Sequence, residues 1–259
     1  MTADLTVVAA ELSLGLLRRE DLPDLAVDSI MRGLDSPSLG ELAGLSAGDL
    51  SDAFDLIRAA LDELGVSIPS PDERDAALWT VIRAEAHAMV AGRRPPIDSA
   101  RWIWQVAALE VEEEGDLRVF IGLASEWDDH PSERPRLERA IVSAAQELLA
   151  RPAPRRWIQL RAPAAGSPLR AHRQGTYEAV NPDDLAVSLR LRTDLARWSS
   201  DFSLNAAGFV DRASAELFVA TGERLAGRLQ DELGGAWHVE YWPEPTRPPG
   251  LRLRRRWWH

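Results

Sequence analysis

Apolar residues recur at helical spacing through the first 150 residues, and this pattern constrains the fold more than any other feature of the chain. It is densest between Arg101 and His130. An apolar residue at every third or fourth position turns one face of a helix toward a core. The start of this stretch is apolar on two sides, so we expect it to be buried between other helices. The stripe that follows consists of Leu117, Phe120, Ile121, Ala124 and Trp127.

Start and stop signals divide the same region into roughly eight helices with short connections. Ser70-Pro71-Asp72-Glu73 combines a capping box with a proline at the first helical position. Gly65 and Gly92 follow two of the expected helices and are typical of helix ends. Gly115-Asp116 is interpreted as the start of the helix that contains Phe120. We therefore expect residues 1–150 to form an irregular all-α helical bundle.

A pair of prolines marks the clearest boundary in the chain. Arg151-Pro152-Ala153-Pro154 coincides with a change of charge, because residues 1–150 contain 29 acidic and 13 basic side chains whereas residues 151–259 contain 12 and 17. Proline-rich segments often separate domains. We therefore expect an acidic all-α domain at 1–150 and a basic-leaning α+β domain at 151–259.

After this boundary, short alternating segments surround two amphipathic helices. Alternation of apolar and polar residues indicates strands, whereas apolar residues three or four apart indicate helices. Residues 162–184 are rich in Pro, Gly, Ser and Asn, which predicts a long loop or a poor hairpin. We expect a small domain with two helices on a short sheet, which makes the whole chain α+β. The expected strands are 157–160, 237–242 and 251–254, and the expected helices are 191–202 and 218–233.

Composition excludes several classes of site. The chain has no cysteine, so it has no disulfide, no thiolate metal ligand and no cysteine nucleophile. It contains neither the G-x-G-x-x-G nor the P-loop motif, which leaves nucleotide binding without support. The first residues do not resemble a signal peptide, and no apolar run is long enough to span a membrane. We expect a cytoplasmic protein with no cofactor.

One group of residues has the spacing of a metal site. Glu126, Asp129 and His130 would lie on one helix face, and carboxylates with an imidazole bind divalent metals. A di-metal bundle would need a repeated Glu-x-x-His motif, which the chain does not have. We therefore interpret this group as a charged surface and expect no metal site.

A second group has the residue types of a hydrolase. Ser167 and His172 are followed by Asp183 and Asp184, but the serine is not in a G-x-S-x-G nucleophile elbow. We therefore expect no catalytic residue, and we do not expect an enzyme. An enzyme or small-ligand binder, with a pocket between the domains lined by residues 162–184, stays open as the alternative.

Residues 36–66 have the outline of a winged helix-turn-helix. The second helix of this outline would contain five acidic residues and one basic residue, Arg58. DNA binding derives most of its affinity from neutralised phosphates, so this helix would be repelled. We expect helical packing here and no nucleic-acid binding.

Arginine and tryptophan meet in two later segments, residues 155–161 and the final residues of the chain. Such segments bind anionic lipids, nucleic acids or acidic partners. The alternative is an edge strand that charge keeps from pairing with other chains. The candidate anion-binding residues are Arg155, Arg156, Arg161, Arg252, Arg254, Arg255 and Arg256.

The second region resembles uncharacterised arginine-rich proteins of actinobacterial type. The resemblance covers residues 167–244 and is most specific in the turn Asn181–Leu185 and the helix end Glu232–Gly235; residues 122–149 show a weaker likeness. It implies no functional residue, because no activity is known for those proteins. Similar domains accompany bacterial conflict loci, where acidic cytoplasmic proteins neutralise basic toxins, so the resemblance implies an immunity-type role by analogy.

The charge pattern favours a non-enzymatic protein-interaction module, an immunity or antitoxin-type protein that binds a basic protein partner. An acidic surface attracts and orients a cationic partner before contact. Nucleic-acid binding through the arginine-rich strands is a weaker alternative. The expected partner-binding residues are Glu112, Glu113, Glu114, Glu126, Asp128 and Asp129.

Overall fold

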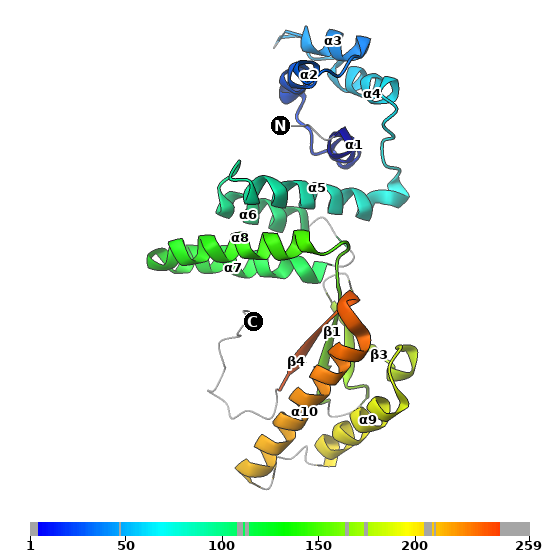
Figure 1. The fold of residues 1–259 in the computed structure, drawn as a ribbon, viewed down its shortest axis with the longest axis vertical. Coiled ribbons are helices and arrows are strands. Elements are labelled where there is room, and N and C mark those ends of the chain that lie inside the picture. The colour runs from blue at the N-terminus through cyan, green and yellow to red at the C-terminus, as the bar shows by residue number, and fades with distance from the viewer. Residues whose placement is uncertain are drawn as a thin grey trace. The chain divides into compact units, whose positions relative to one another are not determined.

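The structure of the protein is a computed structural model that describes residues 5–46, 48–107, 111, 114–163, 166–173, 176–204, 209 and 211–243. The described residues form ten α-helices and four β-strands, which confirms the expected α+β fold class. The chain divides into two compact units, residues 1–106 and 107–259 (Figure 1). The expected domain boundary at residue 150 stays a prediction.

The described part of the first unit is helical throughout. Its first four helices share one core, in which Leu22, Leu39, Ile57 and Leu61 are almost completely buried. Ile57 and Leu61 on α4 are four residues apart, the spacing that places apolar side chains on one helix face, and this face is buried. The helices are α1 (Leu5–Leu14), α2 (Leu22–Met31), α3 (Pro37–Ala43), α4 (Ala53–Glu63), α5 (Arg74–Val90) and α6 (Pro96–Ala107).

Hydrogen bonds at the helix ends explain why these helices begin where they do. The hydroxyl of Ser36 accepts a hydrogen bond from the N–H of Leu39 at 3.2 Å, and it donates one to the carboxylate of Glu63. The N–H of Ser70 donates to the carboxylate of Glu73 at 2.9 Å, which confirms the capping box. The segment with the helix-turn-helix outline therefore folds as α3 and α4, with its apolar residues in the core.

The second unit begins with a helical hairpin. A short 3₁₀ helix, η3 (Glu114–Leu117), leads into α7 (Arg118–Asp129), and a tight turn then leads into α8 (Arg134–Ala150). Phe120 and Leu123 on α7 and Leu137 and Ile141 on α8 are completely buried. With α1 to α6, these helices confirm the all-α region that we expected before residue 150.

The rest of the second unit contains a four-stranded sheet of order β3-β2-β1-β4. The central strand β1 is antiparallel to β2 and parallel to β4. Because β2 and β3 pair antiparallel, residues 162–184 contain a hairpin, as one of the two expected alternatives states. The expected strand at 251–254 lies outside the described residues. The strands are β1 (Arg156–Arg161), β2 (Leu169–Arg173), β3 (Thr176–Val180) and β4 (Trp237–Trp242).

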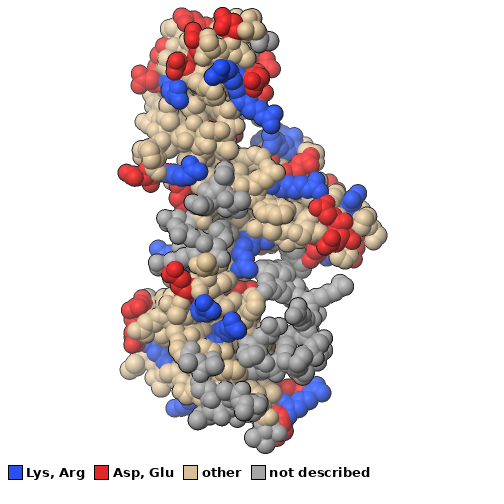
Figure 2. All heavy atoms as spheres, turned by 180° about the vertical axis from the view of Figure 1, so that it is seen from behind, with Lys and Arg blue, Asp and Glu red and all other residues tan. Residues whose placement is uncertain are grey.

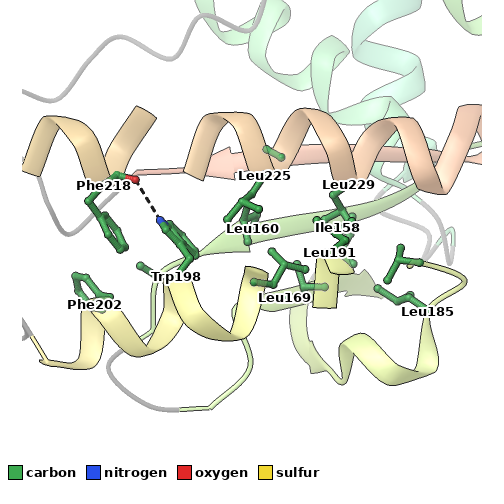
Figure 3. Packing of buried hydrophobic residues seen from close by; sticks show 14 residues of the cluster. Ile158, Leu160, Leu169, Leu185, Leu191, Trp198, Phe202, Phe218, Leu225 and Leu229 are labelled. Carbon is green, nitrogen blue, oxygen red and sulfur yellow. Dashed lines mark hydrogen bonds between the residues drawn. The ribbon is translucent and has the colours of Figure 1, made fainter. Parts of the chain in front are cut away.

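Two helices cover one face of this sheet, as expected. They are α9 (Leu189–Leu204) and α10 (Arg212–Leu233), and their apolar side chains meet those of β1 and β2 in one core (Figure 3). Trp198 stacks on Phe218 at 4.7 Å between ring centroids, and its indole N–H donates to the Phe218 carbonyl at 3.1 Å. This core leaves the opposite face of the sheet for polar residues.

Candidate functional site

The two faces of the sheet differ in chemistry. Along β1, Ile158 and Leu160 belong to the core under α9 and α10, so Trp157 and Gln159 lie on the opposite face. The strand register places the partners of these two residues on that opposite face as well. We call it the polar face, and its residues are Trp157, Gln159, Arg161, Arg170, His172, Tyr177, Ala179, His238, Glu240 and Trp242.

Asp116 in η3 connects the helical hairpin to this face. Its carboxylate accepts hydrogen bonds from the main-chain N–H of Arg155 at 2.8 Å, from the Nε of Arg155 at 2.9 Å and from the indole N–H of Trp157 at 3.2 Å. Arg151 adds an ion pair at 3.5 Å. The Asp116 side chain is completely buried, and a buried carboxylate is stable only when its charge is balanced in this way.

Trp157 lies at the centre of this connection. The backbone of Gly115 packs so closely on its indole ring that a Cβ atom there would come within 3.0 Å of the ring. The ring also packs against His238 of β4, with 4.2 Å between centroids and 42° between the ring planes. Burial, together with the positive charge of Arg155, lowers the pKa of His238 to about 4. The imidazole is therefore neutral at neutral pH.

Arg118, the first residue of α7, makes the second connection. Its guanidinium lies over the Trp157 ring at 5.6 Å and over the Tyr177 ring at 5.8 Å, both within cation–π range. It also donates to the Tyr177 hydroxyl at 2.7 Å, which in turn donates to Glu240 at 3.0 Å. Burial, with the negative charge of Glu240, raises the pKa of Tyr177 to about 12. Tyr177 therefore stays protonated, and its hydroxyl links the Arg118 cation to the Glu240 carboxylate. We call this set of contacts of Asp116 and Arg118 the α7–sheet joint.

His172 is packed beside this joint. It is 4% exposed, and its ring meets the Tyr177 ring edge-on at 4.8 Å. Burial and the Arg118 charge lower its pKa. Two further residues of the hydrolase group have other partners, since Ser167 donates to the carbonyl of Val180 and Asp183 pairs with Arg192. His172 is therefore a buried side chain that packs against Tyr177.

The predicted acidic surface lies at the far end of α7 in its described part. Asp128 and Asp129 are exposed, whereas Glu126 is half-buried and pairs with Arg136 at 3.8 Å. Figure 2 shows acidic side chains gathered at this end of the α7–α8 hairpin. Glu112 and Glu113 lie outside the described residues, as does the side chain of Glu114.

The predicted basic strip is divided in the structure. Arg155 is engaged by Asp116, and the guanidinium of Arg156 lies over the Trp237 ring at 5.6 Å. Arg161 is exposed at the end of β1. Within the described sheet β1 is an interior strand, so the alternative of a charged edge strand is wrong for residues 155–161. The remaining candidates, Arg252, Arg254, Arg255 and Arg256, lie outside the described residues.

The described part of the chain has neither a metal-binding cluster nor a membrane-spanning helix. There, no group of three His, Asp or Glu side chains is arranged to hold a metal ion, and Glu126, Asp129 and His130 form no such group. In the same residues no helix is long and apolar enough to cross a membrane. The cytoplasmic location stays a prediction.

Sequence reasoning missed the residues of the joint. Asp116 is part of the predicted helix start, but its carboxylate bonds residues 39 and 41 positions later rather than the helix. Arg118, Tyr177 and Glu240 belong to no predicted site. The available signal was the alternation along β1, which places Trp157 and Gln159 on a face that the core does not use.

Comparison with known families identifies one similarity. A family model described as Serratia CdiI immunity protein-like matches residues 156–244. The match begins at the first residue of β1 and ends just after β4, so it covers the whole sheet with α9 and α10. A search among curated proteins finds no match. The similarity supports an immunity-type role in protein interaction, and the resemblance to actinobacterial-type proteins stays a prediction.

Proposed function

We propose that this chain is an immunity-type protein that neutralises a basic protein toxin by binding it through the unit 107–259. The observation that supports this most directly is the match of residues 156–244 to the immunity protein-like family. The matched segment coincides with a complete structural element, four strands and two helices around one core. It is therefore a folded module that can present a binding surface by itself.

The α7–sheet joint extends this module to the acidic residues. Asp116 bonds Arg155 and Trp157, and Arg118 bonds Tyr177, so α7 belongs to the same compact unit as the matched segment. The acidic end of α7 and the sheet therefore present one continuous structure to a partner. This is why we assign toxin binding to the whole unit rather than to the matched residues alone.

The position of the acidic residues favours a role in binding. The last turn of α7 contains Glu126, Asp128 and Asp129 and no basic residue. Negative charges at a helix C-terminus are unfavourable by roughly 0.3–1 kcal/mol each, because the helix dipole is negative there. Asp128 and Asp129 are exposed, whereas Glu126 is half-buried, so these two aspartates are the strongest candidates for contact with cationic side chains of the toxin.

Growth protection tests this function. The tagged full-length chain is used to capture a partner from cells that produce it, and the partner is then expressed in a bacterial test host. We expect the partner alone to arrest growth and co-expression of the chain to restore it. A partner that does not arrest growth, or an arrest that the chain does not relieve, would contradict the proposal.

A further inference from the structure

Two imidazoles pack against aromatic rings of the α7–sheet joint. His238 packs against the ring of Trp157, whose indole N–H is bonded to Asp116. His172 meets the Tyr177 ring, whose hydroxyl is bonded to Arg118. Each imidazole therefore touches a ring that makes one of the two connections between α7 and the sheet.

Charged groups from four parts of the unit face these imidazoles. His238 is influenced by Arg155 and Arg151 from the segment before β1, by Asp116 from η3 and by Glu240 from β4. The two carboxylates already serve other donors, since Asp116 accepts from Arg155 and Trp157, and Glu240 accepts from Tyr177.

The surroundings of His172 are similar. Arg118 from α7 acts on it as a like charge, and Glu240 acts in the opposite direction. The Tyr177 hydroxyl lies between these two charges and bonds both. A proton on His172 would therefore place a second cation beside Arg118.

We propose that the α7–sheet joint is acid-sensitive, so that protonation of His172 and His238 weakens the contacts of Asp116 and Arg118 and separates α7 from the sheet. A cation on His238 would compete with Arg155 and Arg151 for Asp116, and a cation on His172 would repel Arg118. This inference concerns the fold of the unit 107–259 and does not depend on the proposed function.

The pH range follows from the sign of the pKa shifts. Burial lowers the pKa of both histidines in the closed joint below the ordinary value of 6.5, for His238 to about 4. An opened joint restores ordinary values, so the open form binds protons more tightly. The closed joint is then favoured fully above pH 6.5 and loses stability as the pH falls from 6.5 toward 4.

Hydrogen exchange of the full-length chain tests this inference. Exchange is measured by mass spectrometry at about pH 7 and about pH 5, on the two sides of the ordinary histidine pKa, with correction for the intrinsic exchange rate. We expect α7 amides to lose protection at the lower pH by about tenfold or more relative to α9 amides, which corresponds to one pKa unit of coupling. The His172→Gln/His238→Gln variant should lose this pH response, and the exposed control His87→Gln should keep it.

Two results would overturn the inference. One is an equal response of α7 in the wild type and the double variant; the other is a constant α7 protection in the wild type. If the double variant does not fold, the test is the pH midpoint at which α7 of the wild type loses its protection from exchange. A midpoint between pH 4 and 6.5 supports the histidines, and a midpoint below pH 4 assigns the response to carboxylates instead and contradicts the inference.

Discussion

Asp116 and Arg155 are joined through both the main chain and the side chain. The N–H of Arg155 donates to Oδ2 of Asp116 at 2.8 Å, and its Nε donates to Oδ1 at 2.9 Å. The Asp116 side chain is completely buried, whereas the Arg155 side chain is 26% exposed. The pair therefore attaches the start of α7 to the start of β1. The Asp116 charge in this pair is fully shielded from water.

Removal of this carboxylate should destabilise the unit 107–259. Asp116→Ala leaves the partly exposed Arg155 and the buried Trp157 indole N–H without their acceptor. Loss of one partner of a buried ion pair typically costs 3–5 kcal/mol, so we expect a decrease of about 3 kcal/mol in the free energy of unfolding. Urea unfolding measures it, with the exposed Asp231→Ala as a control that should change stability by less than about 0.5 kcal/mol. Equal midpoints for both variants would contradict the role of Asp116.

A methyl group between η3 and β1 should also be unfavourable. In Gly115→Ala the new Cβ lies within 3.0 Å of the Trp157 ring, so the ring or the backbone must move. Such overpacking costs about 1–3 kcal/mol. Gly122→Ala is the matched control, because its Cβ meets no atom within 4 Å and alanine is favoured in a helix by up to about 1 kcal/mol. Thermal unfolding should show opposite signs for the two substitutions, and the same sign would argue against close packing at Gly115.

Substitution of Glu11 in the first unit should increase the stability of the protein by an amount that depends on pH. Burial raises the pKa of Glu11; Arg94 opposes this change and Glu85 adds to it. The folded state therefore binds a proton on Glu11 more tightly than the unfolded state does. The stability of the folded state falls as the pH rises above 4.5, the ordinary pKa of a glutamate. Glu11→Gln should raise the melting temperature at neutral pH by roughly 2–4 °C.

The increase in melting temperature of Glu11→Gln should disappear in acid, where the wild-type Glu11 carboxyl is protonated. Calorimetry at several pH values checks this, with the exposed Glu41→Gln on α3 as the control. A gain that does not change with pH would show that the amide acts through packing rather than through the charge.

Local signals predict the helices because they act within one or two turns. The Ser70–Glu73 capping box and the proline after Ser36 mark helix starts that the structure reproduces. Gly65 and Gly92 have φ angles of +71° and +67°, a region that glycine enters without strain, and both follow helix ends. The amphipathic spacing then decides which faces are buried.

The joint could not be predicted in the same way, because its partners are far apart in the sequence. Tyr177 and Glu240 are 63 residues apart and meet only after β3 and β4 join the same sheet. Asp116 has the position of a helix-start residue, so its local context conceals its bonds to Arg155. Strand order and register decide such contacts, and neither follows from the spacing of apolar residues.

If the acidic end of α7 contacts a basic toxin, as we propose, charge reversal there must weaken the binding of the captured toxin. The affinity of the purified toxin is measured for the wild type and for Asp128→Arg/Asp129→Arg at low and moderate salt. Asp49→Arg/Asp62→Arg is the matched control, because it reverses two exposed charges in the first unit and changes the net charge equally.

We expect the α7 variant to bind roughly tenfold or more weakly, which corresponds to about 1.4 kcal/mol, with a smaller difference at higher salt. The control should stay within about twofold of the wild type, since it differs only in long-range charge. Equal dissociation constants for the two variants, at both salt concentrations, would contradict binding through the acidic end of α7.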